Sequence, residues 1–254
     1  MEKVLKNIFL VFITIFTLTA QSQEFDETLK KANSVYDQGL YDSAIVLYSS
    51  VLLANMESPK LYYNLGNAHF KNSNLPKAIL YFEKARKLAP NDEDIEYNLN
   101  IANSMIVDKI ERVPEMFYKH WWKYFYNMFN ADTWTFLSLL IWTIFIVVLG
   151  FFILSKNRRS KKLTFYLASL FLFASIASFG LASQKYYYTK ENKEAIIFTP
   201  TITIKSSPTK GSVDLFVVHE GTKVKIVDKV DKWFKIKIQD GSVGWIPIDA
   251  MEMI

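Results

Sequence analysis

Two uncharged apolar runs flank the short basic segment KNRRSKK, residues 156–162. Residues 133–155 and 163–184 contain no charged side chain and are dense in Leu, Ile, Phe and Val. A bilayer-spanning helix needs about 20 predominantly apolar residues, so each run is long enough to cross a membrane. Because seven residues cannot form a domain between two such helices, the pattern predicts a transmembrane hairpin. Its first helix is at 133–155, its loop at 156–162 and its second helix at 163–184.

The location of positive charge indicates how this hairpin is oriented. The 254-residue chain has a formal net charge of +5, and the segment 156–162 alone carries five cations. Clustered Lys and Arg in a short loop favour the cytoplasmic side of a membrane. Duplex binding needs Lys and Arg spread over one face, which nothing outside this segment offers. We therefore interpret 156–162 as a cytoplasmic basic loop and expect no nucleic acid as a partner.

The amino terminus has the layout of a signal peptide at residues 1–22. Two lysines precede the apolar stretch 8–18, and small and polar residues follow it. Cleavage after Ser22 or after Ala20 fits this pattern, and an uncleaved anchor is the alternative. Each reading exports the segment that follows, and the hairpin returns the carboxyl-terminal part to the same side. The sequence thus predicts a bacterial inner-membrane protein with both soluble domains in the periplasm. With no cysteine, the chain forms no disulfides there.

A repeat with a period of 34 residues precedes the hairpin. At this offset several positions coincide: Asn33 with Asn67, Ala44 with Ala78, Tyr48 with Phe82, and Asn64 with Asn98. Small residues at fixed positions let paired helices approach, and aromatics fill the gaps between them. The stretch 62–91 resembles a tetratricopeptide (TPR) repeat. We predict an all-α TPR solenoid at 23–110, with two repeats and a capping helix.

The resemblance also implies a ligand site. TPR stacks bind extended peptides along a concave face that the first helices line. An Asn amide both donates and accepts hydrogen bonds, which matches a peptide backbone. The alternative is that these Asn residues are polar surface or helix-end positions. The candidate peptide-binding residues are Asn33, Tyr63, Asn64, Asn67, Phe70, Lys71 and Asn98.

The segment 111–132 is the most aromatic part of the chain. Five of its large apolar side chains share one helical face, with two lysines away from it; the five are Phe117, Trp121, Tyr124, Phe125 and Met128. Trp and Tyr concentrate at membrane–water interfaces, and an amphipathic helix can lie in that plane. We predict an aromatic interfacial helix here; packing under the TPR stack or against a partner is the alternative.

Short alternating runs separated by turns occupy residues 193–254. They predict five or six strands and a small all-β barrel. The turns HEG and QDG and the late pair Gly244-Trp245 resemble a bacterial SH3-like domain. In such modules an aromatic groove can hold a peptide or a wall fragment, and Trp233, Phe234 and Trp245 are the candidates. The alternative is that these rings belong to the barrel core.

The sequence offers no constellation for catalysis. The three histidines lie in three different segments, and there is no Gly-rich phosphate loop, HExxH motif or nucleophile elbow. We therefore expect no enzyme activity, no cofactor and no metal.

The order of these parts is itself distinctive. Over nearly its full length the chain resembles the BatE-like TPR and SH3 proteins of the Bacteroides aerotolerance operon. That resemblance implies a membrane assembly with von Willebrand A-domain proteins and a role in envelope stress tolerance. The residues alone predict an inner-membrane scaffold that presents two recognition modules to other membrane or periplasmic proteins. The alternative is a peptidoglycan-binding membrane protein that acts through its SH3-like domain.

Overall fold

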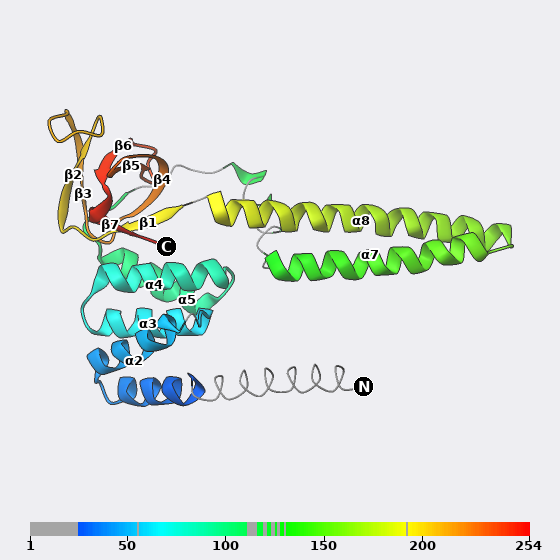
Figure 1. Ribbon diagram of the computed structural model, residues 1–254, viewed down its shortest axis with the longest axis horizontal. Helices are drawn as coiled ribbons and strands as arrows, with labels where there is room; N and C mark the ends of the chain where they lie inside the picture. The colour runs from blue at the N-terminus through cyan, green and yellow to red at the C-terminus, as the bar shows by residue number, and fades with distance from the viewer. Residues whose placement is uncertain are drawn as a thin grey trace, which may run out of the picture.

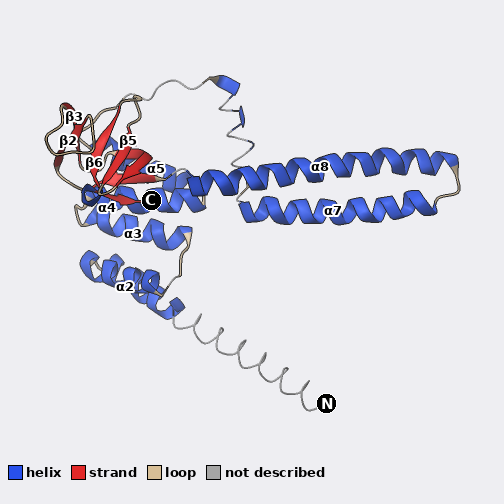
Figure 2. Cartoon of the chain, turned by 45° about the horizontal axis from the view of Figure 1, so that its top comes forward, coloured by secondary structure: helices blue, strands red, loops and turns tan. Residues whose placement is uncertain are grey.

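The computed structural model shows a helical stack, a long helical hairpin and a small β-domain (Figure 1). The residues it describes are 25–54, 56–110, 116–118, 121–122, 125, 128–129, 131–191 and 193–254. The predicted signal peptide lies outside them, as does most of the predicted interfacial helix. Helices and strands are segregated along the chain, and the stack and the β-domain lie at the same end of the hairpin (Figures 1 and 2).

The helical stack confirms the predicted TPR architecture. Residues 25–37 form its first helix. The helices α2 Tyr41–Leu53, α3 Pro59–Lys71, α4 Leu75–Leu88 and α5 Glu93–Met105 follow. Side chains at the amino ends accept hydrogen bonds from free backbone amides: Ser58 from Leu61, and Asn74 from Lys77. These caps satisfy donors that have no partner inside the helix, and they set where α3 and α4 begin.

Alternating small and large side chains pack the helices of the stack together. Ala44 and Ala78 are fully buried at equivalent repeat positions, and so are the aromatic rings of Tyr48 and Phe82. Gly66 of α3 lies directly against the Phe82 ring of α4, where even a methyl group would overlap that ring. The sequence repeat therefore corresponds to one repeated helix–helix contact.

His69 is a buried polar residue inside this stack. Its ring stacks on Tyr81 with centroids 5.3 Å apart and an interplanar angle of 5°. Its Nδ1 is buried without a hydrogen-bond partner. Burial, with a smaller contribution from Lys77, lowers the pKa of His69 to about 4. The ring is therefore neutral at physiological pH and acts as a packing group.

We expect His69→Phe to reduce the acid sensitivity of the stack. Because the folded pKa of His69 is depressed, the unfolded chain takes up a proton first as the pH falls below about 6.5. Stability from the neutral ring is complete above that pH and declines towards pH 4, by about 1–3 kcal/mol. Helical circular dichroism melts at pH 7 and pH 4.5 should differ less for His69→Phe than for the wild type. An unchanged difference would show that other groups set the acid sensitivity.

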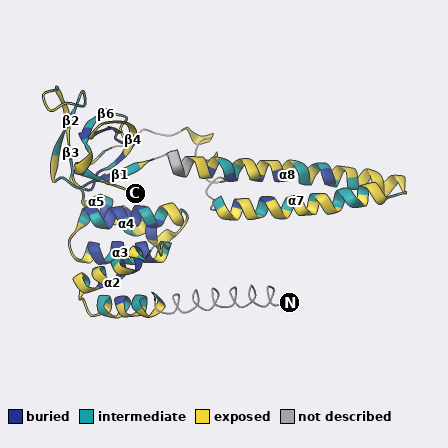
Figure 3. Cartoon of the chain, in the orientation of Figure 1, coloured by how far each residue is buried: buried dark blue, intermediate teal, exposed yellow. Residues whose placement is uncertain are grey.

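The hairpin consists of α7 Ala131–Leu154 and α8 Arg158–Glu191. Both helices are long and apolar enough to cross a membrane. Their large apolar side chains are mostly exposed along the hairpin (Figure 3), unlike those of a core helix in a water-soluble protein. The hydroxyls of Ser138 and Ser175 donate to each other's backbone carbonyls across the pair, at 3.4 and 3.3 Å. Small polar residues of this kind let two helices approach closely in lipid.

The basic segment is only partly a loop. We predicted a turn over 156–162, but α8 already begins at Arg158. The amide oxygen of Asn157 accepts a hydrogen bond from the backbone amide of Arg159, at 3.0 Å, which caps this helix end. Lys and Arg are good helix formers, so the helix continues beyond the apolar run. The five cations remain clustered at this end of the hairpin.

The β-domain is a seven-stranded antiparallel sheet of the predicted SH3-like kind. Its strands are β1 Glu194–Ile197, β2 Thr201–Lys205, β3 Asp214–His219, β4 Lys223–Val230, β5 Trp233–Lys237, β6 Val243–Pro247 and β7 Met251–Met253. Their order in the sheet is β3-β2-β6-β5-β4-β1-β7. The short β7, which follows the 3-10 helix Ile248–Ala250, was not predicted. A Cβ at Gly244 would overlap the Ile204 side chain, so close packing of β6 on β2 requires the glycine before Trp245.

Candidate peptide-binding groove

Asparagine side chains connect successive first helices of the TPR stack. The Asn33 amide oxygen accepts hydrogen bonds from the Asn64 amide, at 3.1 Å, and from the Tyr48 hydroxyl, at 2.6 Å. One repeat further on, the Asn67 oxygen accepts from the Asn98 amide at 2.9 Å. An offset of 34 residues maps the first Asn pair onto the second. The amides therefore form a repeated ladder between helices.

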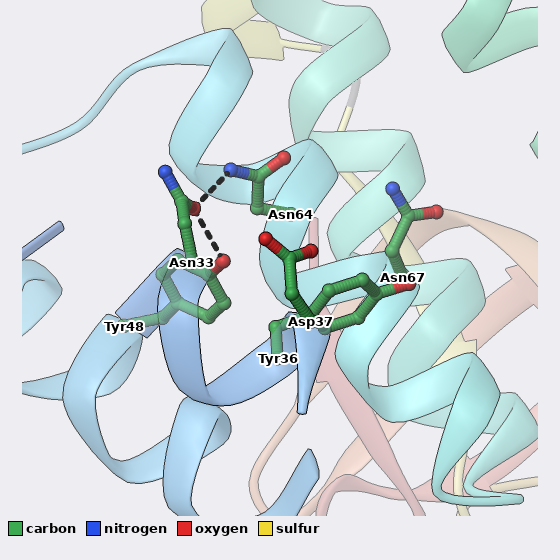
Figure 4. Close-up of a pocket in the computed structure, with 6 residues that line it drawn as sticks. All are labelled: Asn33, Tyr36, Asp37, Tyr48, Asn64 and Asn67. Carbon is green, nitrogen blue, oxygen red and sulfur yellow. Dashed lines mark hydrogen bonds between the residues drawn. The ribbon is translucent and has the colours of Figure 1, made fainter. Parts of the chain in front are cut away.

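A cavity of about 320 Å³ opens beside this ladder (Figure 4). It lies between the first helix of the stack and α3, which supply its polar lining together with Tyr48 of α2. The lining residues are Asn33, Tyr36, Asp37, Tyr48, Asn64 and Asn67. Three of the predicted groove residues therefore share one hollow, and each of them faces it.

The ladder leaves complementary amide groups at the cavity. Within the hydrogen bonds that the described residues make, Asn64 uses its amide nitrogen and Asn67 its amide oxygen. The Asn64 oxygen and the Asn67 nitrogen, one turn apart on α3, remain available to a ligand. A peptide backbone presents both an N–H donor and a C=O acceptor, so this pair can take both.

The electrostatics of the cavity favour binding rather than acid–base chemistry. Burial raises the pKa of Tyr48 to about 12, and the nearby Tyr36 and Asp37 add to the effect. The Tyr48 hydroxyl therefore stays protonated and serves as the donor that orients Asn33. Asp37 is exposed at the cavity and gives it a negative charge, which suits a basic side chain on a ligand.

The other predicted groove residues lie outside the cavity lining. Asn98 donates to the Tyr63 hydroxyl at 2.9 Å, so these two residues hold the ladder together. Phe70 is partly buried against the apolar cluster of α4 and α5, and Lys71 is exposed at the end of α3.

Three lining residues were missed by the sequence prediction. Tyr36 and Asp37 fall on Phe70 and Lys71 at the 34-residue offset, so the same register would have identified them. Tyr48 was interpreted only as a packing aromatic, and the structure shows that its hydroxyl also reaches the ladder.

The SH3-like domain separates its three candidate aromatic residues. Phe234 is buried in the barrel core, whereas Trp233 and Trp245 are only half-buried. Trp245 lies opposite Lys205 on one neighbouring strand and opposite Lys235 on the other. The Lys235 ammonium is 5.9 Å from the Trp245 ring centroid, within cation–π range. This row presents an aromatic ring between two lysines, of which Lys205 is already ion-paired with Asp214.

Among the described residues, no three His, Asp or Glu side chains gather closely enough to hold a metal ion.

Comparison with known proteins identifies two modules. Residues 59–92 match the tetratricopeptide repeat family, and residues 200–249 match the bacterial SH3 domain family. The chain joins a TPR module to a bacterial SH3 module. Together with two apolar helices long enough for a membrane, these matches support the predicted combination of TPR, candidate membrane helices and SH3-like domain.

Individual relatives match only parts of the chain. The BBSome complex member BBS4 of Bos taurus is 32% identical over 87 residues, which is 34% of this chain and 17% of that protein. The chain thus spans about a sixth of the length of this curated relative. The crystal structure of an NlpC/P60 family protein from Bacillus cereus ATCC 10987 is 13% identical, with a TM-score of 0.21. That likeness covers 28% of this chain and 23% of the other.

Proposed function

We propose that this protein is a membrane-anchored interaction scaffold whose TPR groove binds an extended segment of another envelope protein. TPR and SH3 modules indicate protein–protein or peptidoglycan interactions. The observation that carries the choice of the TPR groove is the ladder beside the cavity. It holds the Asn64 oxygen and the Asn67 nitrogen at the spacing of one helical turn, available to a peptide backbone. We assign no catalytic role to the chain.

Orientation follows from the charge at the turn of the hairpin. The five cations at 156–162 favour a cytoplasmic turn, and we propose on this ground that both soluble modules lie in the periplasm, at the inner membrane of a bacterial cell. The resemblance to BatE-like proteins makes von Willebrand A-domain membrane proteins the first partners to test, in a complex for envelope stress tolerance.

Removing the two amides that face the cavity should weaken partner capture. The variant is Asn64→Ala with Asn67→Ala in the full-length chain, used as bait for solubilised envelope proteins. Loss of two hydrogen bonds, each contributing about 0.5–1.5 kcal/mol, should reduce affinity roughly tenfold. Quantitative mass spectrometry of the captured proteins measures the effect.

A matched control separates binding from stability. Asn98→Ala breaks one of the two interhelical bonds that the double variant loses, together with its own bond to Tyr63, but Asn98 does not line the cavity. We expect Asn98→Ala to lower the melting temperature at least as much and still retain the partner. Equal capture by the wild type and the double variant would show that the groove is not the binding site.

The second candidate function is binding of peptidoglycan through the SH3-like domain. It is favoured by Trp245, whose ring offers a stacking surface for a sugar while the neighbouring Lys235 ammonium meets a carboxylate. Co-sedimentation with isolated peptidoglycan that is lost in Trp245→Ala, without any captured protein, would support this function over the first.

A further inference from the structure

The SH3-like module lies against the end of the TPR stack. Ile196 of β1 is fully buried in one apolar cluster with Ile79 of α4 and Leu99 of α5. Phe198 and the carboxyl-terminal Ile254 pack against the same cluster. These contacts join segments that lie on either side of the two membrane helices in the sequence, and both views show the β-domain next to α4 (Figures 1 and 2).

A partly buried carboxylate holds the polar part of this interface. Asp108, just after α5, accepts hydrogen bonds from the backbone amide of His219, at 2.8 Å, and from the Thr222 hydroxyl, at 2.6 Å. Its second oxygen contacts the His219 Nδ1 at 2.7 Å. Thr222 is almost completely buried, so the carboxylate provides its hydroxyl with a partner that water cannot supply.

An ion-pair network adds a second polar connection. The Lys223 ammonium lies 3.0 Å from the carboxylate of Glu83 on α4 and 2.6 Å from that of Glu194 on β1. Arg86 pairs with Glu83 at 2.5 Å from within α4. Glu83 is buried, and a buried charge requires compensation of this kind.

The fit is close enough to require a glycine. Gly221 lies in the turn between β3 and β4 with φ +84°. A Cβ there would be 2.7 Å from the Ile106 Cγ2 and 3.3 Å from the Ile79 Cδ1. The turn therefore packs so closely on α4 and on the end of α5 that there is no room for a side chain at Gly221.

We propose that the SH3-like module is the carboxyl-terminal cap of the TPR stack and that the two modules form one rigid unit. The last repeat of a solenoid exposes an apolar face that needs a cover with a polar outer side. We expected α5 to be this cap. Instead, β1 and the chain end cover the apolar cluster that contains Ile79, Leu99 and Ala102. The cap thus comes from a segment that follows the hairpin in the sequence. Both modules must therefore lie on the same side of the membrane. This inference does not depend on the identity of any ligand.

A designed disulfide tests the cap directly. The chain has no cysteine, so any cross-link comes from the introduced pair. The Ile106 Cβ lies 3.8 Å from an ideal Cβ at Gly221, within the usual disulfide range of about 3.5–4.5 Å. Ile106→Cys with Gly221→Cys, in the full-length membrane-embedded protein, should oxidise readily. After cleavage at a protease site introduced into the turn at 155–157, the two halves should migrate together on a non-reducing denaturing gel.

Two further pairs keep the test decisive. Ile106→Cys with Gly211→Cys should leave the halves separate, because Gly211 has no neighbouring side chain or backbone within 4 Å. Carbodiimide coupling of Lys223 to Glu83, whose charged atoms are 3.0 Å apart, crosses the same interface with no substitution at all. This second cross-link provides the test of the interface if the Gly221 variant does not fold. Halves that separate for both interface pairs, in protein with wild-type circular dichroism, would overturn the proposal.

Discussion

Replacing Gly66 with leucine should unfold the TPR stack or leave it severely destabilised. A Cβ at Gly66 would lie 2.6 Å from the Phe82 Cδ1, and the Phe82 ring is itself fully buried. The ring cannot move away, because Tyr63 and the α4–α5 cluster surround it. Overpacking of this kind costs about 1–3 kcal/mol for a few added methylenes, and a leucine side chain exceeds that. Local hydrogen exchange of α3 and α4 peptides in the full chain, measured by mass spectrometry, gives the loss of protection.

The control for this prediction lies on the same helix. Lys60→Leu adds a leucine at an exposed position in the first turn of α3. It should change protection by no more than about 0.5 kcal/mol, the usual range for surface substitutions. If Gly66→Leu were as mild as Lys60→Leu, the two helices could not be as close as the structure places them.

The second large effect should come from Asp108→Ala. The substitution leaves the buried Thr222 hydroxyl and the His219 backbone amide without the acceptor that they share. An unsatisfied buried group costs about 1–3 kcal/mol, so the two together cost at most roughly 2–6 kcal/mol, with the partly buried His219 amide contributing less than Thr222. Hydrogen exchange should rise in β1, in the β3–β4 turn and at the end of α5 together. Asp249→Ala, which removes an exposed carboxylate, should leave all three segments protected.

Asp108 also makes the stability of this interface depend on pH in the acid range. Burial alone would raise the pKa of Asp108, but hydrogen bonds from Thr222 and from His219 outweigh burial, so the pKa lies below its ordinary value. The unfolded chain therefore binds the proton first as the pH falls. The contribution of Asp108 is complete above the ordinary carboxyl pKa of about 3.9 and is lost as the pH falls through the folded value. In Asp108→Ala this part of the acid dependence should disappear.

Local patterns in the sequence were enough to predict the separate modules. The 34-residue offset located the helix pairs because each repeat makes the same contact, as Gly66 and Phe82 illustrate. The absence of charge located α7 and α8, since hydrocarbon tolerates few charged side chains. The start of α8 was placed too late because Arg158 has a high helix propensity that the apolar pattern ignores.

Alternation along β5 would have refined the SH3-like candidates. Successive side chains of a strand point to opposite faces, so Trp233 shares a face with Lys235, and Phe234 shares one with Ile236. Phe234 and Ile236 are buried in the core, whereas the Lys235 side of the strand faces outward. The three aromatics were grouped by residue type, and the strand period already separates them.

The docking of the two modules had no signal that local reasoning could detect. Asp108 follows a helix and His219 precedes a turn, and 111 residues separate them. In the sequence, neither residue differs from an ordinary polar residue of its own segment. Glu83 similarly resembles an exposed helix acid until Lys223 of β4 is brought against it. Contacts of this kind depend on the global path of the chain and not on the period of any element.

The unbroken length of α8 sets how far from the lipid this protein can reach. With 34 residues it is roughly 50 Å long at 1.5 Å per residue, against a hydrocarbon core of about 30 Å. Only two residues separate its end from β1, which itself packs on α4. The helix therefore fixes the distance between the bilayer and the two modules. A connection of two residues is too short to let the groove and the SH3-like face move outward. With the membrane orientation proposed above, a ligand meets both modules within a few tens of ångströms of the bilayer, which favours partners that are themselves held at the membrane.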